Sequence, residues 1–187
     1  MNIIVFGPPG AGKGTQSKYL VSKLNNFQVS TGDILREEMK KNSDIGQQIT
    51  INMNEGKFVS DEIVNSLIKK LIDDPQKKDK LIFDGYPRSL SQAKYLDLIL
   101  DKSHQKIDHI FFLNVNKDII IERIEKRKIL ENRSDDKTDT IIKRYDTYME
   151  ITRPVLNYYS KNLNFHEING TQKIDQITKE IEIFIDV

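Results

Sequence analysis

Glycines and one lysine cluster near the start of the chain, in the stretch GPPGAGKGT. Gly7, Gly12 and Lys13 fit the phosphate-binding pattern G-x-x-x-x-G-K-[ST]. Gly14 stands where that pattern has a hydroxyl, and Thr15 follows one place later. A glycine-rich turn between a strand and a helix offers backbone N–H groups and the positive end of a helix dipole to phosphate oxygens. The stretch therefore predicts a nucleotide-phosphate loop that gives Mg²⁺ no direct protein ligand.

A second polar cluster follows an apolar strand pattern in LIFDGYPRSLSQ. Asp84 would lie at the carboxyl end of its strand, in the crevice where open α/β sheets bind ligands. Its charge would suit the hydration shell of Mg²⁺. Arg88 offers a planar fork that matches a phosphate. The stretch alone also fits a turn with an ion pair, and the phosphate loop favours the binding interpretation.

Two arginines in a later helical segment share one helix face. Arg123 and Arg127 are four residues apart, so their charges repel each other weakly. The pair is consistent with a solvated surface, but it makes more sense facing a polyanionic phosphate or a nucleobase.

Composition narrows the class of protein. The 187 residues carry 29 basic and 28 acidic side chains, which argues against a general nucleic-acid binder. No apolar run reaches membrane-spanning length and no signal peptide precedes the first strand pattern, so we expect a cytoplasmic protein. The chain has no cysteine, which excludes disulfides and thiolate metal sites. His104, His109 and His166 belong to no motif, and no chemistry is assigned to them.

The positioning elements follow from hydrophobic periodicity. Apolar runs predict strands at 2–6, 80–84, 109–115 and 163–168, and helical periods occur after residue 13 and at 89–101, 117–130 and 136–162. Continuous apolar strands imply burial on both faces. We therefore predict an α/β fold, a doubly wound parallel sheet of about five strands flanked by helices.

Two stretches interrupt this alternation. Residues 30–72 show three successive helical patterns without a convincing strand, and 130–137 form a short polar insertion. Both are consistent with mobile flaps or with ordinary surface segments. Pro154 is expected to kink or split the long late helix.

Three stretches, GPPGAGKGT, STGDILR and LIFDGYPRSLSQ, resemble the adenylate kinase family in their order and spacing. The resemblance extends through NRSDDKTDTIIKR and NGTQ, essentially over the whole chain. It implies one P-loop nucleoside monophosphate kinase domain, 1–187, with its core at 1–29, 60–127 and 137–187, an AMP-binding flap at 30–59 and a short lid at 128–136. The implied reaction is reversible phosphoryl transfer from ATP to AMP giving two ADP, with Mg²⁺, directly in line and without a covalent intermediate.

The resemblance also implies roles for individual residues. The ATP site would contain Gly10, Ala11, Gly12, Lys13, Gly14, Thr15, Arg123, Arg127 and Gln172. The AMP site would contain Thr31, Arg36, Lys57, Phe58, Val59, Gly85, Tyr86, Pro87, Arg88, Gln92, Arg133 and Arg144. The catalytic side chains would be Lys13, Arg88, Arg127, Arg133 and Arg144. Mg²⁺ would be held by phosphates and waters, with Asp84 and Thr15 acting through those waters.

Gln92 resembles the amide that reads the adenine of AMP in this family. A site with such an amide rejects a base of the wrong hydrogen-bonding pattern, because its polar groups stay unpaired. Taken without the resemblance, Gln92 also fits an ordinary surface position of a helix. AMP has a second phosphate pKa of about 6 and is largely a dianion at neutral pH, so it needs no general base. Catalysis then consists of positioning and neutralising charge.

Departures from the family pattern refine these expectations. The short insertion resembles the short-lid form, without a structural zinc. Gln172 stands at a position of the NGTQ stretch where a lysine is common in the family. The expected partners are ATP, AMP and ADP, with no nucleic acid and no membrane, and the chain is expected to be a monomer. A UMP/CMP kinase of the same superfamily and a non-catalytic nucleotide-binding protein remain alternatives; Thr31 and Gln92 favour AMP, and the lysine and arginines needed for catalysis are present.

Overall fold

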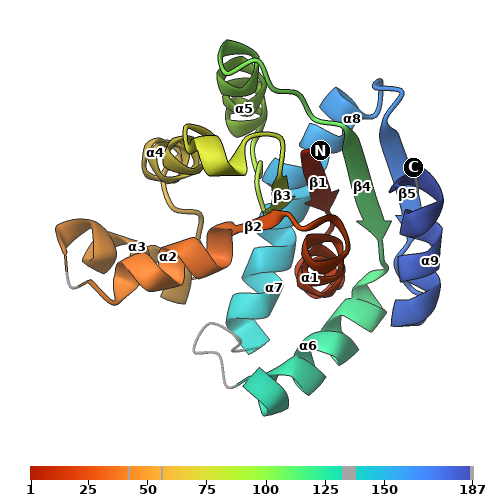
Figure 1. Ribbon diagram of the computed structural model, residues 1–187. Helices are drawn as coiled ribbons and strands as arrows, with labels where there is room; N and C mark the ends of the chain where they lie inside the picture. The colour runs from red at the N-terminus through yellow and green to blue at the C-terminus, as the bar shows by residue number, and fades with distance from the viewer. Residues whose placement is uncertain (42, 56, 132–137, 186–187) are drawn as a thin grey trace.

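The computed structural model describes residues 1–41, 43–55, 57–131 and 138–185, and the side chains of residues 126–141 lie outside this description (Figure 1). Most of the predicted polar insertion at 130–137 and most of the expected lid at 128–136 therefore lie outside the described residues.

The centre of the molecule is one parallel sheet of five strands in the order β2-β3-β1-β4-β5. The strands are β1 (Ile3–Phe6), β2 (Phe27–Ser30), β3 (Leu81–Asp84), β4 (His109–Asn114) and β5 (Phe165–Asn169). Strand β1 is central: Ile4 is in register with Phe83 of β3 on one side and with Ile110 of β4 on the other. The predicted doubly wound parallel sheet is confirmed, and its strand order reverses direction beside β1.

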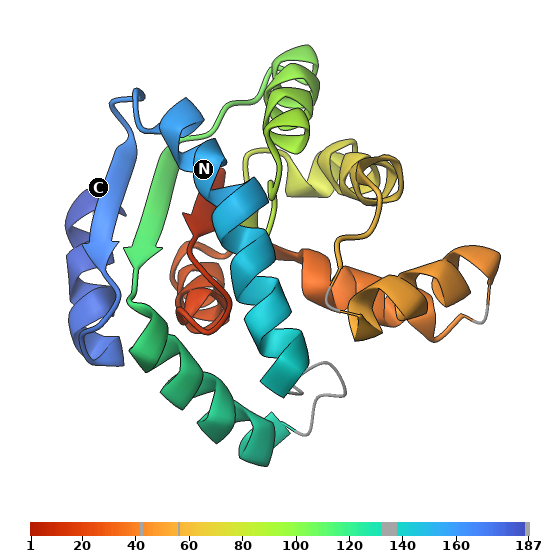
Figure 2. The same ribbon diagram turned by 180° about the vertical axis from the view of Figure 1, so that it is seen from behind.

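Helices cover both faces of this sheet (Figures 1 and 2). They are α1 (Lys13–Leu24), α2 (Thr31–Met39), α3 (Asp44–Asn54), α4 (Asp61–Ile72), α5 (Leu90–Lys102), α6 (Lys117–Glu131), α7 (Thr138–Thr147), α8 (Arg153–Tyr159) and α9 (Ile174–Ile185). A short 3₁₀ turn, Pro75–Lys77, precedes β3.

Alternate residues of β1 serve the two hydrophobic cores. Ile3 and Val5 belong to the core formed with α1, α6 and α9. Ile4 and Phe6 belong to the core formed with α2 to α5 and α8. Successive side chains of a strand point to opposite faces, so a strand covered by helices on both sides must be apolar throughout. Because both faces of β1 are buried in these cores, the end of the strand has a fixed position, and so does the start of the glycine-rich turn.

Strand β2 was not among the strands predicted from the sequence. Its four residues include an exposed Phe27 and half-buried Gln28 and Ser30, and only Val29 is fully buried. An edge strand of this kind lacks the continuous apolar run that marks β1 and β3. The strand nevertheless matters for the site, because it ends at Ser30, directly before α2.

The three helical patterns predicted between residues 30 and 72 are confirmed as α2, α3 and α4. Helices α2 and α3 lie beside each other and project from the β2 edge of the sheet (Figure 1). The Ser30 hydroxyl caps α2 by accepting a hydrogen bond from the N–H of Asp33 at 3.3 Å. The segment that the resemblance assigns to an AMP-binding flap thus leaves the sheet through a capped turn.

The long late helix is split, as Pro154 predicted. Helix α7 ends at Thr147, a π-helical turn covers Tyr148–Thr152, and Pro154 lies in the first turn of α8. Proline fits there because the first N–H groups of a helix need no intrahelical acceptor. The π turn lies along the cavity described next.

Candidate active site

The glycine-rich loop connects β1 to α1 and packs closely on its neighbours. Gly12 caps α1 with φ 96°, a left-handed conformation that favours glycine, and no side chain caps this helix. A Cβ built on Gly10 would lie 2.8 Å from Cγ1 of Ile124 in α6. The tight turn presents the backbone at the N-terminus of α1, which is the geometry that binds phosphate.

Lys13 lies across this loop. Its Nζ donates hydrogen bonds to the carbonyl oxygens of Gly7 at 2.8 Å and Pro8 at 2.9 Å. These contacts fix a long flexible side chain against the backbone turn. The ammonium group therefore stays at the mouth of the loop.

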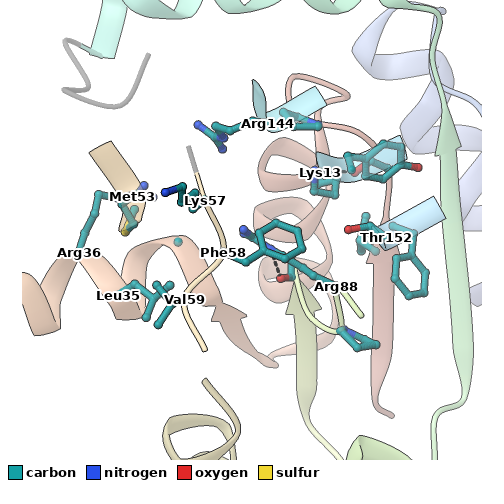
Figure 3. A pocket seen from close by; sticks show the side chains of 18 residues that line it. Lys13, Leu35, Arg36, Met53, Lys57, Phe58, Val59, Arg88, Arg144 and Thr152 are labelled. Atoms are coloured by element: carbon teal, nitrogen blue, oxygen red, sulfur yellow. Dashed lines mark hydrogen bonds between the residues drawn. The ribbon is translucent and has the colours of Figure 1, made fainter. Parts of the chain in front are cut away.

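A cavity open to solvent lies beside the loop, and we call it the cationic cavity. Five cationic side chains line it from five separate parts of the chain (Figure 3), namely Lys13, Arg36, Lys57, Arg88 and Arg144. None of the described residues that line it is acidic. Such a one-signed lining concentrates anions and suits a ligand with several phosphate groups.

Arg88 is held in place by the turn that follows β3. Its Nε donates to the Gly85 carbonyl at 2.6 Å, and its Nη2 donates to the Thr31 hydroxyl at 3.1 Å. The guanidinium also lies 5.6 Å from the centre of the Phe58 ring, a cation–π distance. A Cβ built on Gly85, whose φ is 75°, would lie 2.8 Å from Nη2 of Arg88. Glycine at this position therefore makes room for the arginine.

A smaller pocket, which we call the side pocket, is lined by Arg88, Thr31, Phe58, Val59 and Gln92 among others. Gln92 is only 2% exposed, so the surface interpretation of this residue is wrong. Its Oε1 accepts from the N–H of Arg88 at 2.7 Å, and its Nε2 donates to Oδ1 of Asp61 at 2.6 Å. The amide thus has a fixed place in the wall of the side pocket.

Two other expected AMP residues lie on the flap side of the cationic cavity. Arg36 pairs with Asp33 at 2.6 Å, one turn earlier in α2. The Lys57 ammonium pairs with Glu55 at 2.7 Å, and its side chain is 69% exposed. Both pairs are accessible to solvent, so either cation can turn to a ligand at little cost.

Tyr86 has its side chain in the hydrophobic core and not in either cavity. It is 1% exposed, and its hydroxyl donates to Oδ1 of Asn65 at 2.6 Å. Burial raises the pKa of this hydroxyl well above its usual range. Any contact of Tyr86 with a nucleotide would have to come from its backbone.

The expected ATP residues gather at the other end of the phosphate loop. Arg123 of α6 donates to the carbonyl oxygen of Ala11 at 3.2 Å and to that of Gln172 at 3.4 Å. This arginine therefore joins the phosphate loop to the turn between β5 and α9. The side chain of Arg127, expected in the ATP site, and residue Arg133, expected in the AMP site, lie outside the described residues.

Asp84 at the end of β3 faces the first turn of α1. Its Oδ2 accepts from Nε2 of Gln28 at 3.1 Å and would lie 3.5 Å from a Cβ built on Gly14. Thr15 is exposed in the same turn. A carboxylate and a hydroxyl beside a phosphate loop are hard oxygen donors, so these residues fit a hydrated Mg²⁺ ion.

Motif reasoning missed several residues that line the cationic cavity, among them Leu35, Met53, Tyr148 and Thr152. Leu35 and Met53 look like ordinary apolar positions of amphipathic helices. Tyr148 and Thr152 follow Arg144 at intervals of four residues, a spacing that places them on one helix face. That spacing could have identified Tyr148 and Thr152 from the sequence as neighbours of Arg144.

A parallel sheet with its glycine-rich turn after β1 and a charged crevice at the strand ends defines the P-loop class of nucleotide-binding proteins. Comparison with known proteins is more specific. The sequence model of the family described as Adenylate kinase matches residues 5–164. The chain belongs to the adenylate kinase family.

Several curated proteins are similar to this chain over nearly its full length. The adenylate kinase of Pelagibacter ubique is 46% identical, and the match covers 100% of both chains. The adenylate kinase of Mycoplasma capricolum is 40% identical over 98% of this chain and 100% of the relative. That of Caulobacter sp. is 38% identical over 100% of this chain and 99% of the relative.

Within the described residues, no helix has the length and apolar character needed to cross a bilayer. No group of three or more histidine, cysteine or acidic side chains in the described part of the chain could hold a metal ion.

Proposed function

We propose that the chain catalyses reversible phosphoryl transfer between ATP and AMP to give two ADP. The observation that carries this proposal is the cationic cavity, which runs from the phosphate loop to the side pocket. The loop suits a nucleoside triphosphate, and a pocket with a buried amide suits a nucleobase. The cations between them lie where two phosphate chains would meet. The names of the relatives support the same reaction.

The chemistry proposed is a direct in-line transfer. The AMP phosphate attacks as a dianion, so the protein supplies positioning and positive charge and no nucleophile. Lys13 and Arg88 are held by backbone carbonyls and both line the cavity. Arg144 lines the same cavity from α7, and Arg127 and Arg133 complete the proposed set. Preorganised cations of this kind stabilise the charge on the transferred group without reorganising.

The AMP subsite proposed is the flap side of the cationic cavity together with the side pocket. Arg88 would bind the AMP phosphate, and Gln92 would read the base. Thr31, Arg36, the backbone of 57–59 and the turn 85–88 complete it. The ATP subsite proposed is residues 10–15 with Arg123, Arg127 and Gln172. Arg123 already joins that loop to the turn carrying Gln172.

Mg²⁺ is the proposed cofactor, bound by nucleotide phosphates and by waters that Asp84 and Thr15 orient. When bound, the ion neutralises phosphate charge and orients the transferred group. Asp84 supports this role because it lies beside Gly14 and accepts only one described side-chain hydrogen bond, from Gln28. No structural zinc is proposed, in keeping with the absence of cysteine from the sequence.

We further propose the core, flap and short-lid division implied by the resemblance, with one domain acting as a cytoplasmic monomer. The projection of α2 and α3 from the sheet edge supports a separate flap (Figure 2).

A coupled assay of ADP formation from ATP tests the proposal. AMP, CMP and UMP are compared as acceptors, each with and without Mg²⁺. We expect AMP to be the best acceptor by orders of magnitude, and activity to require Mg²⁺. Preference for CMP or UMP would instead make the chain a pyrimidine nucleotide kinase, and no ADP from any acceptor would leave only a nucleotide-binding protein.

A further inference from the structure

Asp61, the first residue of α4, is the centre of a small hydrogen-bond cluster at the start of α5. Its Oδ1 accepts from Nε2 of Gln92 at 2.6 Å. Its Oδ2 accepts from the Ser89 hydroxyl at 2.9 Å and from the Ser91 hydroxyl. The carboxylate thus receives three donors from one turn of a neighbouring helix.

These contacts determine which end of the Gln92 amide is oxygen and which is nitrogen. A carboxylate accepts hydrogen bonds only, so the amide must turn its NH₂ group toward Asp61. The N–H of Arg88 donates only, so the amide must turn its oxygen the other way. Reversing the amide would set two acceptors against each other at Asp61 and two donors against each other at Arg88.

Each end of the amide keeps one further hydrogen-bonding capacity. An amide NH₂ has two donors and an amide oxygen has two lone pairs, and each end has one partner among the described residues. The remaining donor and acceptor match the adjacent acceptor and amino donor on the edge of adenine. Hypoxanthine presents a donor and an acceptor in the reverse order. An amide of fixed direction therefore distinguishes the two bases, whereas an amide free to flip would accept both.

We propose that Asp61 is a specificity-determining positioning residue: it locks the direction of the Gln92 amide so that the side pocket takes 6-aminopurine monophosphates and rejects 6-oxopurine ones. Asp61 acts only through Gln92. The proposal rests on the proposed role of Gln92 as the residue that reads the base of AMP.

The test compares AMP and IMP as acceptors, because the two differ only in this edge of the base. Asp61→Asn keeps the shape of the side chain but can donate as well as accept. We expect its ratio of kcat/KM for AMP to that for IMP to fall about tenfold, the effect of losing a hydrogen bond to a charged group. The KM for AMP should rise, whereas the KM for ATP should stay within about twofold of the starting protein.

Two matched controls separate this role from general support of the fold. Glu62→Gln removes a carboxylate from the same helical turn, and Ser91→Ala removes another of the donors that Asp61 receives. Both should keep the AMP to IMP ratio of the starting protein. A ratio that falls equally in Ser91→Ala would make Asp61 a structural tie between α4 and α5 and overturn the proposal.

Gln92→Ala distinguishes failure of this inference from failure of the proposed function. If Gln92→Ala loses the preference for AMP and Asp61→Asn retains it, the locking role of Asp61 is wrong and the reading role of Gln92 stands. If Gln92→Ala retains the preference, another group reads the base and both are wrong.

A measurement on the unmodified protein avoids any dependence on the folding of Asp61→Asn. NMR of the Gln92 side-chain NH₂ group, assigned by its loss in Gln92→Ala, should show one proton protected from exchange without nucleotide. The second proton should become protected on adding AMP but not IMP. Two freely exchanging protons in the absence of nucleotide would contradict the lock.

Discussion

Lys13 and Arg88 are each held by carbonyl oxygens of the turn they extend from. Lys13 donates to Gly7 and Pro8, and Arg88 donates to Gly85. Flexible cations lose rotamer freedom when they bind a ligand, and contacts of this kind fix part of that freedom beforehand. The geometry around the transferred phosphoryl group thus depends on two backbone turns as much as on the charges themselves.

Replacing Lys13 by methionine should lower kcat by about two to three orders of magnitude, the cost of removing one preorganised group that stabilises transition-state charge. The measurement is ADP formation from ATP and AMP, with thermal unfolding followed in parallel. Lys18→Met, on the exposed side of the same helix, is the control and should retain activity. Near-normal turnover in Lys13→Met would remove the lysine from the proposed mechanism.

Much of the candidate site follows from local sequence, and the rest depends on tertiary packing. Lys13, Arg88 and Gln92 stand in short motifs, which can be recognised from residues that are close together in the sequence. The partnership of Asp61 with Gln92 requires α4 to lie against α5, and no local pattern reports this. From the sequence alone, Asp61 is interpreted as an acidic residue that favours the start of a helix. The structure does place it in the first turn of α4.

At the scale of elements, apolar patterns predicted four of the five strands, including β5 at one edge of the sheet, and missed β2 at the other edge. Strand β1 is buried at all four positions, whereas β2 buries only Val29 fully. An edge strand has one neighbour and less cover, so polar residues are tolerated there and the pattern fades. The late helix shows the opposite case, because a single proline correctly predicted that this helix is split.

Strands β4 and β5 carry a pair of histidines that the proposed chemistry does not use. Nδ1 of His109 lies 3.2 Å from Nε2 of His166, and the His166 ring stacks on Phe184 of α9 at 3.9 Å. Burial lowers the pKa of both histidines, with Asp108 partly opposing this at His109 and the His109 charge adding to it at His166. The folded protein therefore favours the neutral pair.

This pair predicts a loss of stability in mild acid. Because the folded pKa values lie below the unfolded value of about 6.5, the unfolded chain binds more protons as the pH falls. The stabilisation is full above about pH 6.5 and is lost as the pH falls through the folded pKa values. Thermal unfolding between pH 8 and pH 5 should show a steeper fall in Tm for the starting protein than for His166→Gln. If Tm fell equally with pH in both proteins, protonation of the histidine pair would not be coupled to folding.

At the scale of the whole molecule, two parts of the chain contribute cations to the cationic cavity. The first is the segment around α2 and α3, which projects beside the β2 edge (Figures 1 and 2), and the second is α7. Arg36 and Lys57 line the cavity from the first part, and Arg144 lines it from the second. A polyanion bound between them would neutralise their mutual repulsion and draw the parts together.

Hydrogen exchange should report this closure by segment. AMP should slow amide exchange in residues 31–54, and a non-hydrolysable ATP analogue should slow it in the loop at 7–15, because bound ligands oppose local opening. Both ligands together should give the largest protection in α2 and α3, since charges on both sides are then satisfied. If the ATP analogue alone protected residues 31–54, the proposed assignment of the flap to AMP would be wrong.

The central place of β1 in the sheet also has a consequence during synthesis of the chain. Ile3 is in register with Ile82 and with His109, which the ribosome adds 79 and 106 positions later. At about 5–20 residues per second, the first strand waits roughly 5 to 20 s for its second neighbour. Until β4 has been made, at least one edge of this apolar strand stays unpaired, and an unpaired strand edge favours aggregation. The phosphate loop, though translated almost first, can take its shape only after most of the polypeptide has been made.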